Sequence, residues 1–110
     1  MKIDFSQNWN NKLKNKLFTT IRTYSKKKEK DYLSNVGKKV QINLKGKKLF
    51  KAKLSKIEVR KFKEIPEELL ILNSGAENAF EAWKIFKGFG ISLVDKVIVL
   101  YFKNDNKNTI

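Results

Sequence analysis

The segment Phe18–Tyr24 carries the residues best suited to binding chemistry in this sequence. Its β-branched and aromatic residues alternate, which predicts a strand with Thr20, Arg22 and Tyr24 on one face. Arg22 is one of only two arginines in a chain with 23 lysines. A guanidinium group binds phosphate or carboxylate through two parallel hydrogen bonds, which an ammonium group cannot do. Arg22 is therefore the leading candidate for anion binding, and an ion pair within the fold is the alternative.

Two residues of this region could also act in catalysis. Lys16 lies four residues before Thr20, and an adjacent base can activate a hydroxyl nucleophile, so Lys16 and Thr20 are the candidate catalytic residues. The chain has no histidine and no cysteine. Imidazole bases, thiol nucleophiles, disulfides and metal sites built from these ligands are therefore excluded. Any catalysis would depend on Lys, Tyr, Thr, Ser, Asp and Glu.

Other motifs of catalysis and cofactor binding are absent from the sequence. It contains no phosphate loop, no dinucleotide fingerprint and no EF-hand spacing. Glu67 and Glu68 are adjacent on a predicted helix, where neighbouring side chains point apart, so they are expected to be structural. We expect neither a metal nor a cofactor.

The charge distribution favours a polyanionic partner. The net charge is +14, and residues 1–63 hold 20 basic side chains against 4 acidic ones. A field of this sign attracts RNA, DNA or an anionic membrane surface, and Tyr24 or Trp83 could stack on a base. A solvated lysine-rich surface with no specific partner is the alternative. The nucleic-acid-binding candidates are Lys16, Thr20, Arg22, Tyr24, Lys26, Lys27 and Lys28.

The N-terminal half must position these residues. Apolar residues recur every four positions ahead of the strand, which predicts an amphipathic helix: Phe5, Trp9, Leu13 and Leu17. Core packing is the favoured role for Trp9. After the strand, Ser25–Asp31 is highly charged and predicts a solvated loop or a short frayed helix. Lys38–Leu44 alternates as a strand, and Lys45–Lys47 predicts a hairpin turn. The next strand, Lys48–Phe62, changes register near Ser55–Lys56, which predicts a bulge.

The C-terminal half predicts two helices and a closing strand. Pro66 followed by acidic residues marks a helix start, and Asn73–Gly75 breaks that helix. A second apolar stripe, in which Trp83 is expected to pack in the core, follows in residues 79–87. The nearly continuous apolar run of Asp95–Phe102 suits the centre of a sheet, and a polar tail follows from about residue 103. We therefore expect one α+β domain over residues 1–110, with a small mixed, mostly antiparallel β-barrel and flanking helices.

The longest apolar run, Val97–Phe102, has six residues and is too short to cross a membrane. No signal-peptide pattern is present at the N-terminus. We expect a soluble, cytoplasmic monomer with no membrane partner.

Four segments in order resemble the ASCH domains of the PUA-like superfamily. Asn15–Arg22 looks like the family's entry motif, Gly-x-Lys-x-x-Thr-x-Arg. Gly37–Ile42 resembles its Gly-x-x-Val-x-Ile strand, and Lys51–Phe62 resembles the long strand that leads to Glu64–Glu68. Asp95–Phe102 resembles its closing strand, so that the resemblance covers roughly residues 3–102.

The resemblance implies a small β-barrel with a cleft lined by the entry motif. The superfamily is associated with RNA binding, and some ASCH members are ribonucleases or amidohydrolases that act on modified nucleosides. The amidohydrolase motif has a lysine three residues before the threonine and a glutamate farther along, where this chain has Leu17 and Leu72. An RNA-binding module is therefore favoured, with a metal-independent ribonuclease or amidohydrolase as the alternative, and DNA remains an open partner.

Overall fold

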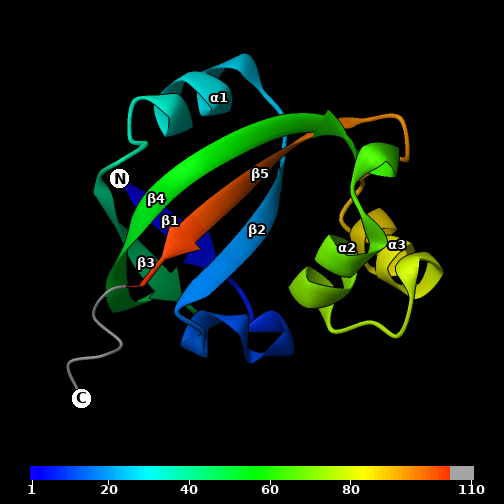
Figure 1. The fold of residues 1–110 in the computed structure, drawn as a ribbon, viewed down its shortest axis with the longest axis horizontal. Helices are drawn as coiled ribbons and strands as arrows, with labels where there is room; N and C mark the ends of the chain where they lie inside the picture. The colour runs from blue at the N-terminus through cyan, green and yellow to red at the C-terminus, as the bar shows by residue number, and fades with distance from the viewer. Residues whose placement is uncertain (105–110) are drawn as a thin grey trace.

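A curled five-stranded sheet forms the centre of the protein (Figure 1). The computed structural model describes residues 1–104, with the backbone alone at residues 9–11, so the predicted polar tail lies mostly outside the described residues. In sheet order the strands are β1 (Lys2–Phe5), β3 (Lys39–Leu44), β4 (Lys47–Lys61), β5 (Lys96–Lys103) and β2 (Leu17–Thr23). The helical segments are η1 (Trp9–Lys14), α1 (Lys26–Leu33), η2 (Phe62–Glu64), α2 (Glu67–Ser74) and α3 (Ala79–Lys87).

The predicted α+β class and mixed, mostly antiparallel sheet are confirmed, but the sheet is a half-barrel and not a clear closed barrel. β1 pairs parallel with β3, while β3, β4, β5 and β2 pair antiparallel in succession. Among the described residues, β1 and β2 are the two edges and are not hydrogen-bonded to each other. β1 has four residues and is paired along its length with β3, so the sheet is open between β1 and β2.

The predicted first helix is wrong. Phe5 ends strand β1, a short 3-10 helix follows, and Leu17 begins strand β2 with 66% of its surface exposed. Pairing with β3 buries Ile3 and Phe5 through strand alternation, which a four-residue spacing of apolar residues does not reveal. Leu13 is buried, and the side chain of Trp9 lies outside the described residues.

The other predicted elements have counterparts in the structure. Strand β2 matches the predicted strand, the hairpin turn joins β3 to β4, and the register of β4 against β5 shifts between Leu54 and Lys56. Helix α2 starts after Pro66 and ends at Gly75, whose φ of 75° is left-handed. The charged run after β2 forms the eight-residue helix α1, capped by Ser25, whose side chain accepts a hydrogen bond from the Lys28 amide.

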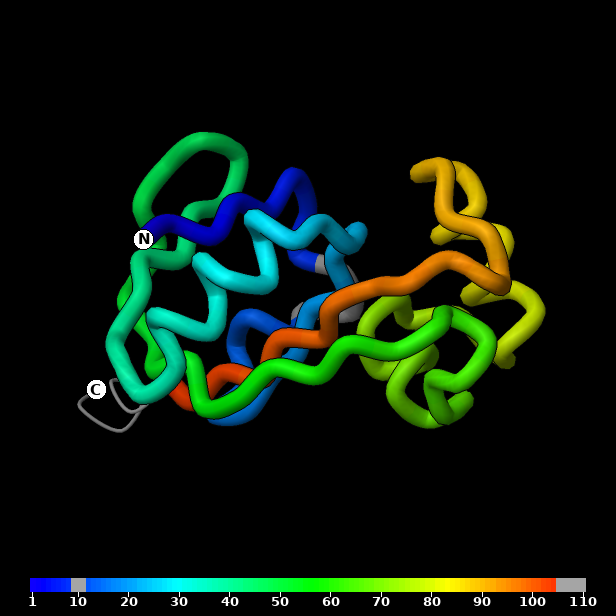
Figure 2. The backbone as a smooth tube through the Cα atoms, turned by 90° about the horizontal axis from the view of Figure 1, so that it is seen from above, coloured from blue at the N-terminus to red at the C-terminus, as the bar shows by residue number. Residues whose placement is uncertain are grey.

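Two hydrophobic clusters lie on opposite faces of the sheet. Ile98, Leu100 and Phe102 point into the curl, whereas Val97 and Val99 pack with α2 and α3 on the outer face. This alternation explains why β5 is almost continuously apolar, as predicted for a central strand. Figure 2 shows α2 and α3 gathered at one end of the sheet, with β4 and β5 running from them to the other end. The second of these clusters therefore fixes α2 and α3 against the outer face of the sheet.

Replacing Gly46 with alanine is expected to lower the free energy of unfolding by about 1 kcal/mol. Lys45 and Gly46 have φ values of 52° and 79°, as a type I′ hairpin turn requires. No described atom lies within 4 Å of the position a Cβ would take, so the cost is backbone strain. Gly46→Asn should cost less, because Asn tolerates the left-handed region. Urea unfolding of the variants tests this, and equal losses would contradict it.

Candidate functional site

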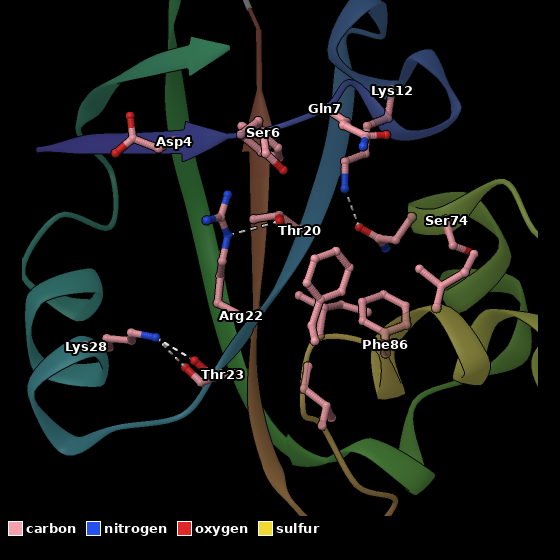
Figure 3. A pocket seen from close by; sticks show the side chains of 16 residues that line it. Asp4, Ser6, Gln7, Lys12, Thr20, Arg22, Thr23, Lys28, Ser74 and Phe86 are labelled. Atoms are coloured by element: carbon pink, nitrogen blue, oxygen red, sulfur yellow. Dashed lines mark hydrogen bonds between the residues drawn. The ribbon is translucent and has the colours of Figure 1, made fainter. Parts of the chain in front are cut away.

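A pocket of about 360 Å³ lies between the two edge strands of the sheet and the ends of α2 and α3 (Figure 3). Its size falls in the lower part of the range for small-molecule sites. Its polar lining comes from three elements and includes Lys12, Thr20, Arg22, Asn73 and Ser74. Its apolar lining includes Ile85, Phe86, Phe89 and Ile91 from α3 and the loop after it, and Phe86 lies across the pocket from Arg22. The pocket thus combines a cationic wall with an apolar wall.

The side chain of Arg22 is held in place by Thr20 of β2 and Phe5 of β1. Its Nε donates a hydrogen bond of 3.2 Å to Thr20 Oγ1, and its guanidinium carbon lies 4.8 Å from the centre of the Phe5 ring. Burial lowers the pKa of Arg22, while Tyr32 and Asp4 raise it, but an arginine remains charged at neutral pH. Within the described part of the chain, Arg22 forms no ion pair. Its planar fork is therefore positioned for an anion from outside.

Lys12 is the second cation of the pocket. Only 4% of its surface is exposed, and its Nζ donates a hydrogen bond of 3.0 Å to Asn73 Oδ1. The Asn73 amide is oriented by donating to Thr19 Oγ1 at 2.6 Å and to the Leu69 carbonyl at 2.8 Å. Burial, and secondarily the charge of Arg22, lower the pKa of Lys12 to about 7. Lys12 is therefore half-protonated near neutral pH.

The two cations share one aromatic ring. Lys12 Nζ lies 5.4 Å and the Arg22 guanidinium 4.8 Å from the centre of the Phe5 ring. Cation–π contacts offset part of the cost of burying a charge. Among the residues that line the pocket, Asp4 is the only carboxylate, and it forms no ion pair with either cation in the described structure. The arrangement leaves positive charge in the pocket that a bound anion would neutralise.

The structure brings three of the predicted binding residues to the pocket. Thr20, Arg22 and Lys28 line it, and Lys28 Nζ donates to Thr23 Oγ1 at 2.6 Å. The shared face predicted for Thr20 and Arg22 is confirmed by their hydrogen bond.

The remaining predicted residues lie elsewhere. Lys16 is exposed between η1 and β2, and its carbonyl accepts a hydrogen bond from the Asn104 amide. The Tyr24 hydroxyl donates to Glu29 at 2.8 Å, and its ring lies 5.3 Å from Lys96 Nζ. Lys26 and Lys27 are exposed on α1. None of these four residues lines the pocket.

Lys12 was not among the predicted site residues. Its place depends on the 3-10 helix η1, which has three residues per turn, and on contact with Asn73 of α2, 61 residues away in the chain. Nothing local distinguishes Lys12 from the other lysines. The one available signal was Asn73, a polar residue beside an otherwise apolar helical run.

A second basic surface lies on the outer face of the sheet. The register places Lys39 opposite Lys53, and Lys53 opposite Lys103, in a row across β3, β4 and β5. All three are exposed, and neighbouring strands are about 4.8 Å apart, so like charges lie side by side. Beside this row, Lys56 Nζ lies 4.5 Å from the centre of the Tyr101 ring. The register thus gathers three lysines in one row on this face.

Glu67 has a structural role, as predicted. Its Oε2 accepts a hydrogen bond of 2.8 Å from the Ala79 amide, which ties α2 to the start of α3. Leu72, at the position where the resemblance would place a glutamate, is exposed. In the part of the chain that the structure describes, no group of three acidic residues could hold a metal ion. No helix among these residues is long and apolar enough to span a membrane.

Comparison with family models, with curated proteins and with solved structures finds no match to this chain.

Proposed function

We propose that this protein is an RNA-binding module of the PUA-like, ASCH type, which holds a phosphate and its nucleotide in the pocket beside β2. The observation that carries the proposal is Arg22, a positioned guanidinium in a pocket with no ion-pair partner among the described residues. A chain that otherwise uses lysine almost throughout places one of its two arginines at this point. Phosphate is the anion whose geometry the guanidinium fork matches, and RNA presents it repeatedly.

The surroundings of the pocket support the same proposal. Lys28 lies at its rim, and the exposed lysines of α1 and the sheet extend the positive field beyond it. Such lysines bind the backbone without reading sequence, so affinity should fall steeply with salt through release of counterions. The apolar wall around Phe86 offers a surface for a base or ribose.

Loss of Arg22 is expected to weaken RNA binding about tenfold or more, because a charge-assisted phosphate contact is removed. A labelled RNA pool is titrated with wild type, Arg22→Ala and Arg60→Ala at two salt concentrations, with unlabelled DNA as competitor. Arg60 is the matched control, since it is the other arginine and does not line the pocket. Its guanidinium forms an ion pair of 2.8 Å with Glu58. Arg60→Ala should bind nearly as wild type. Equal binding by all three proteins would show that the lysine surface binds generically and that the pocket is not the site.

An enzyme acting on RNA or a modified nucleoside is the second candidate, and Lys12 is the observation that favours it. A buried lysine with a pKa of about 7 can accept a proton near neutral pH. RNA integrity is therefore checked in the same binding samples. Fragmentation by wild type that is lost in Lys12→Met and Thr20→Ala, with binding retained in Thr20→Ala, would establish the enzyme. Intact RNA throughout would favour the binding module.

A further inference from the structure

We propose that the pocket recognises a terminal phosphate, the phosphomonoester at the end of an RNA chain or on a free nucleotide, in preference to an internal phosphodiester. This inference rests on the proposed function and specifies its ligand. Four features of the described residues carry it: the enclosure of Lys12, the pairing of two cations, the small volume and the apolar wall.

Because Lys12 is recessed in the pocket, it favours a phosphate that projects from the end of a ligand. The Nζ of Lys12 contacts Asn73 of α2 and the Phe5 ring, and only 4% of the residue is exposed. An internal phosphodiester continues as a chain on both sides, so it must lie across an open surface. A terminal phosphate is attached at one side only and can reach a recessed nitrogen. The exposed lysine row on β3, β4 and β5 suits the internal phosphates instead.

The charges favour a dianion. A phosphomonoester carries about 1.5 to 2 negative charges at pH 7, because its second pKa is about 6, whereas a diester carries one. Arg22 and a protonated Lys12 together supply two positive charges. The other charged groups that line the pocket are Asp4 from β1 and Lys28 from α1, while α2 contributes the uncharged Asn73 and α3 contributes only apolar residues.

Binding of a dianion should therefore be coupled to proton uptake. In the unliganded pocket, burial and Arg22 hold the pKa of Lys12 near 7, so much of Lys12 is neutral above that pH. A bound phosphate places negative charge beside the amine and restores the charged form.

The volume and the apolar wall fit one nucleotide. A pocket of about 360 Å³ is too small for a folded RNA segment and suits a single small ligand. Phe86 lies across the pocket from Arg22 in Figure 3, and Phe89 and Ile91 also line the pocket. They offer an apolar surface to the ribose or base of the terminal nucleotide.

Calorimetric titration tests the inference with three probes: a short RNA carrying a 5′-phosphate, the same RNA with a 5′-hydroxyl, and a nucleoside 5′-monophosphate. Each titration is run at pH 8 in two buffers that differ in ionisation enthalpy, which counts the protons taken up. We expect the phosphorylated RNA to bind about tenfold or more tightly than the hydroxyl form, with uptake of about 0.5–1 proton per site. Lys12→Met should lose both the preference and the uptake, whereas Lys14→Met, at an exposed position of η1, should keep both.

The outcomes separate this inference from the proposed function. Equal affinity for both RNAs without proton uptake would overturn the terminal-phosphate inference and leave RNA binding standing. Tight, proton-coupled binding of the nucleoside monophosphate with no RNA binding would support the terminal-phosphate site, assign it to free nucleotides and overturn the RNA-binding proposal. The wild-type comparison needs no variant, so the test holds even if Lys12→Met fails to fold.

Discussion

Raising the pH from 7 to 9 is expected to increase the free energy of unfolding through Lys12 by about 2 kcal/mol. Burial lowers the pKa of Lys12 from 10.5 to about 7 in the folded protein, whereas the unfolded chain restores the ordinary value. Between these two pKa values the unfolded state binds more protons, so stability rises with pH. Below about pH 7, Lys12 is protonated in both states and contributes no further pH dependence.

Denaturant unfolding of wild type and Lys12→Met at pH 7, 8 and 9 measures this effect. Methionine keeps the apolar stem but cannot titrate, so stability of the variant should lack this rise. The lost hydrogen bond to Asn73 lowers the stability of the variant by an amount that does not change with pH, and the difference in slope isolates the titration. Lys14→Met, two residues away and exposed, should keep the wild-type slope. Parallel slopes in wild type and Lys12→Met would show that Lys12 is charged and hydrated at neutral pH.

Phe102→Ala is expected to lower the free energy of unfolding by about 3–5 kcal/mol. Phe102 is 1% exposed on the central strand β5, and its ring stacks on that of Phe18 with centres 5.0 Å apart. Phe18 in turn packs edge-on against Phe5 and Phe50. Removing the ring leaves a cavity at the centre of an aromatic cluster that β5 cannot close, because it is paired on both sides.

Urea unfolding measures this loss, and Phe102→Leu is the matched control, with a cost expected near 1 kcal/mol because most of the volume is kept. The cluster also supports the site, since the Phe5 ring contacts both pocket cations. Phe102→Leu should therefore retain anion binding if it folds. A cost below about 1 kcal/mol for the alanine variant would mean that the cluster repacks around the gap.

Strand alternation and turn chemistry made most of the sheet predictable. The β3–β4 hairpin, the bulge after Leu54 and the central position of β5 follow from local patterns that the structure confirms. The prediction of a first helix failed because Phe5 and Leu13 are buried for different reasons. Phe5 is buried in a strand, and Leu13 is buried in a 3-10 helix. The open edge of the sheet also escaped prediction, because it depends on β1 pairing with β3 and not on any local signal.

The candidate site was predictable only where it follows one strand. Thr20 and Arg22 share a face because strand residues alternate, and the rarity of arginine directed attention to Arg22. Lys12 joins them through tertiary packing of η1 against α2, and a single sequence contains no record of that contact. Lys16 was chosen as the basic residue just before the strand, but it is exposed between η1 and β2 and does not line the pocket.

The order of strands in the sheet determines when the pocket can exist. β1 and β2 are made early in translation, yet β1 pairs with β3, and β2 pairs with β5 near the end of the described chain. Such long-range pairing slows folding relative to helical proteins, because distant segments must meet before any contact is gained. Until residues 96–103 have left the ribosome, Phe18 has no stacking partner and Arg22 has no ordered strand. Interrupted translation products would therefore carry the lysine charge but lack the pocket, so only a chain extended through β5 could bind its ligand selectively.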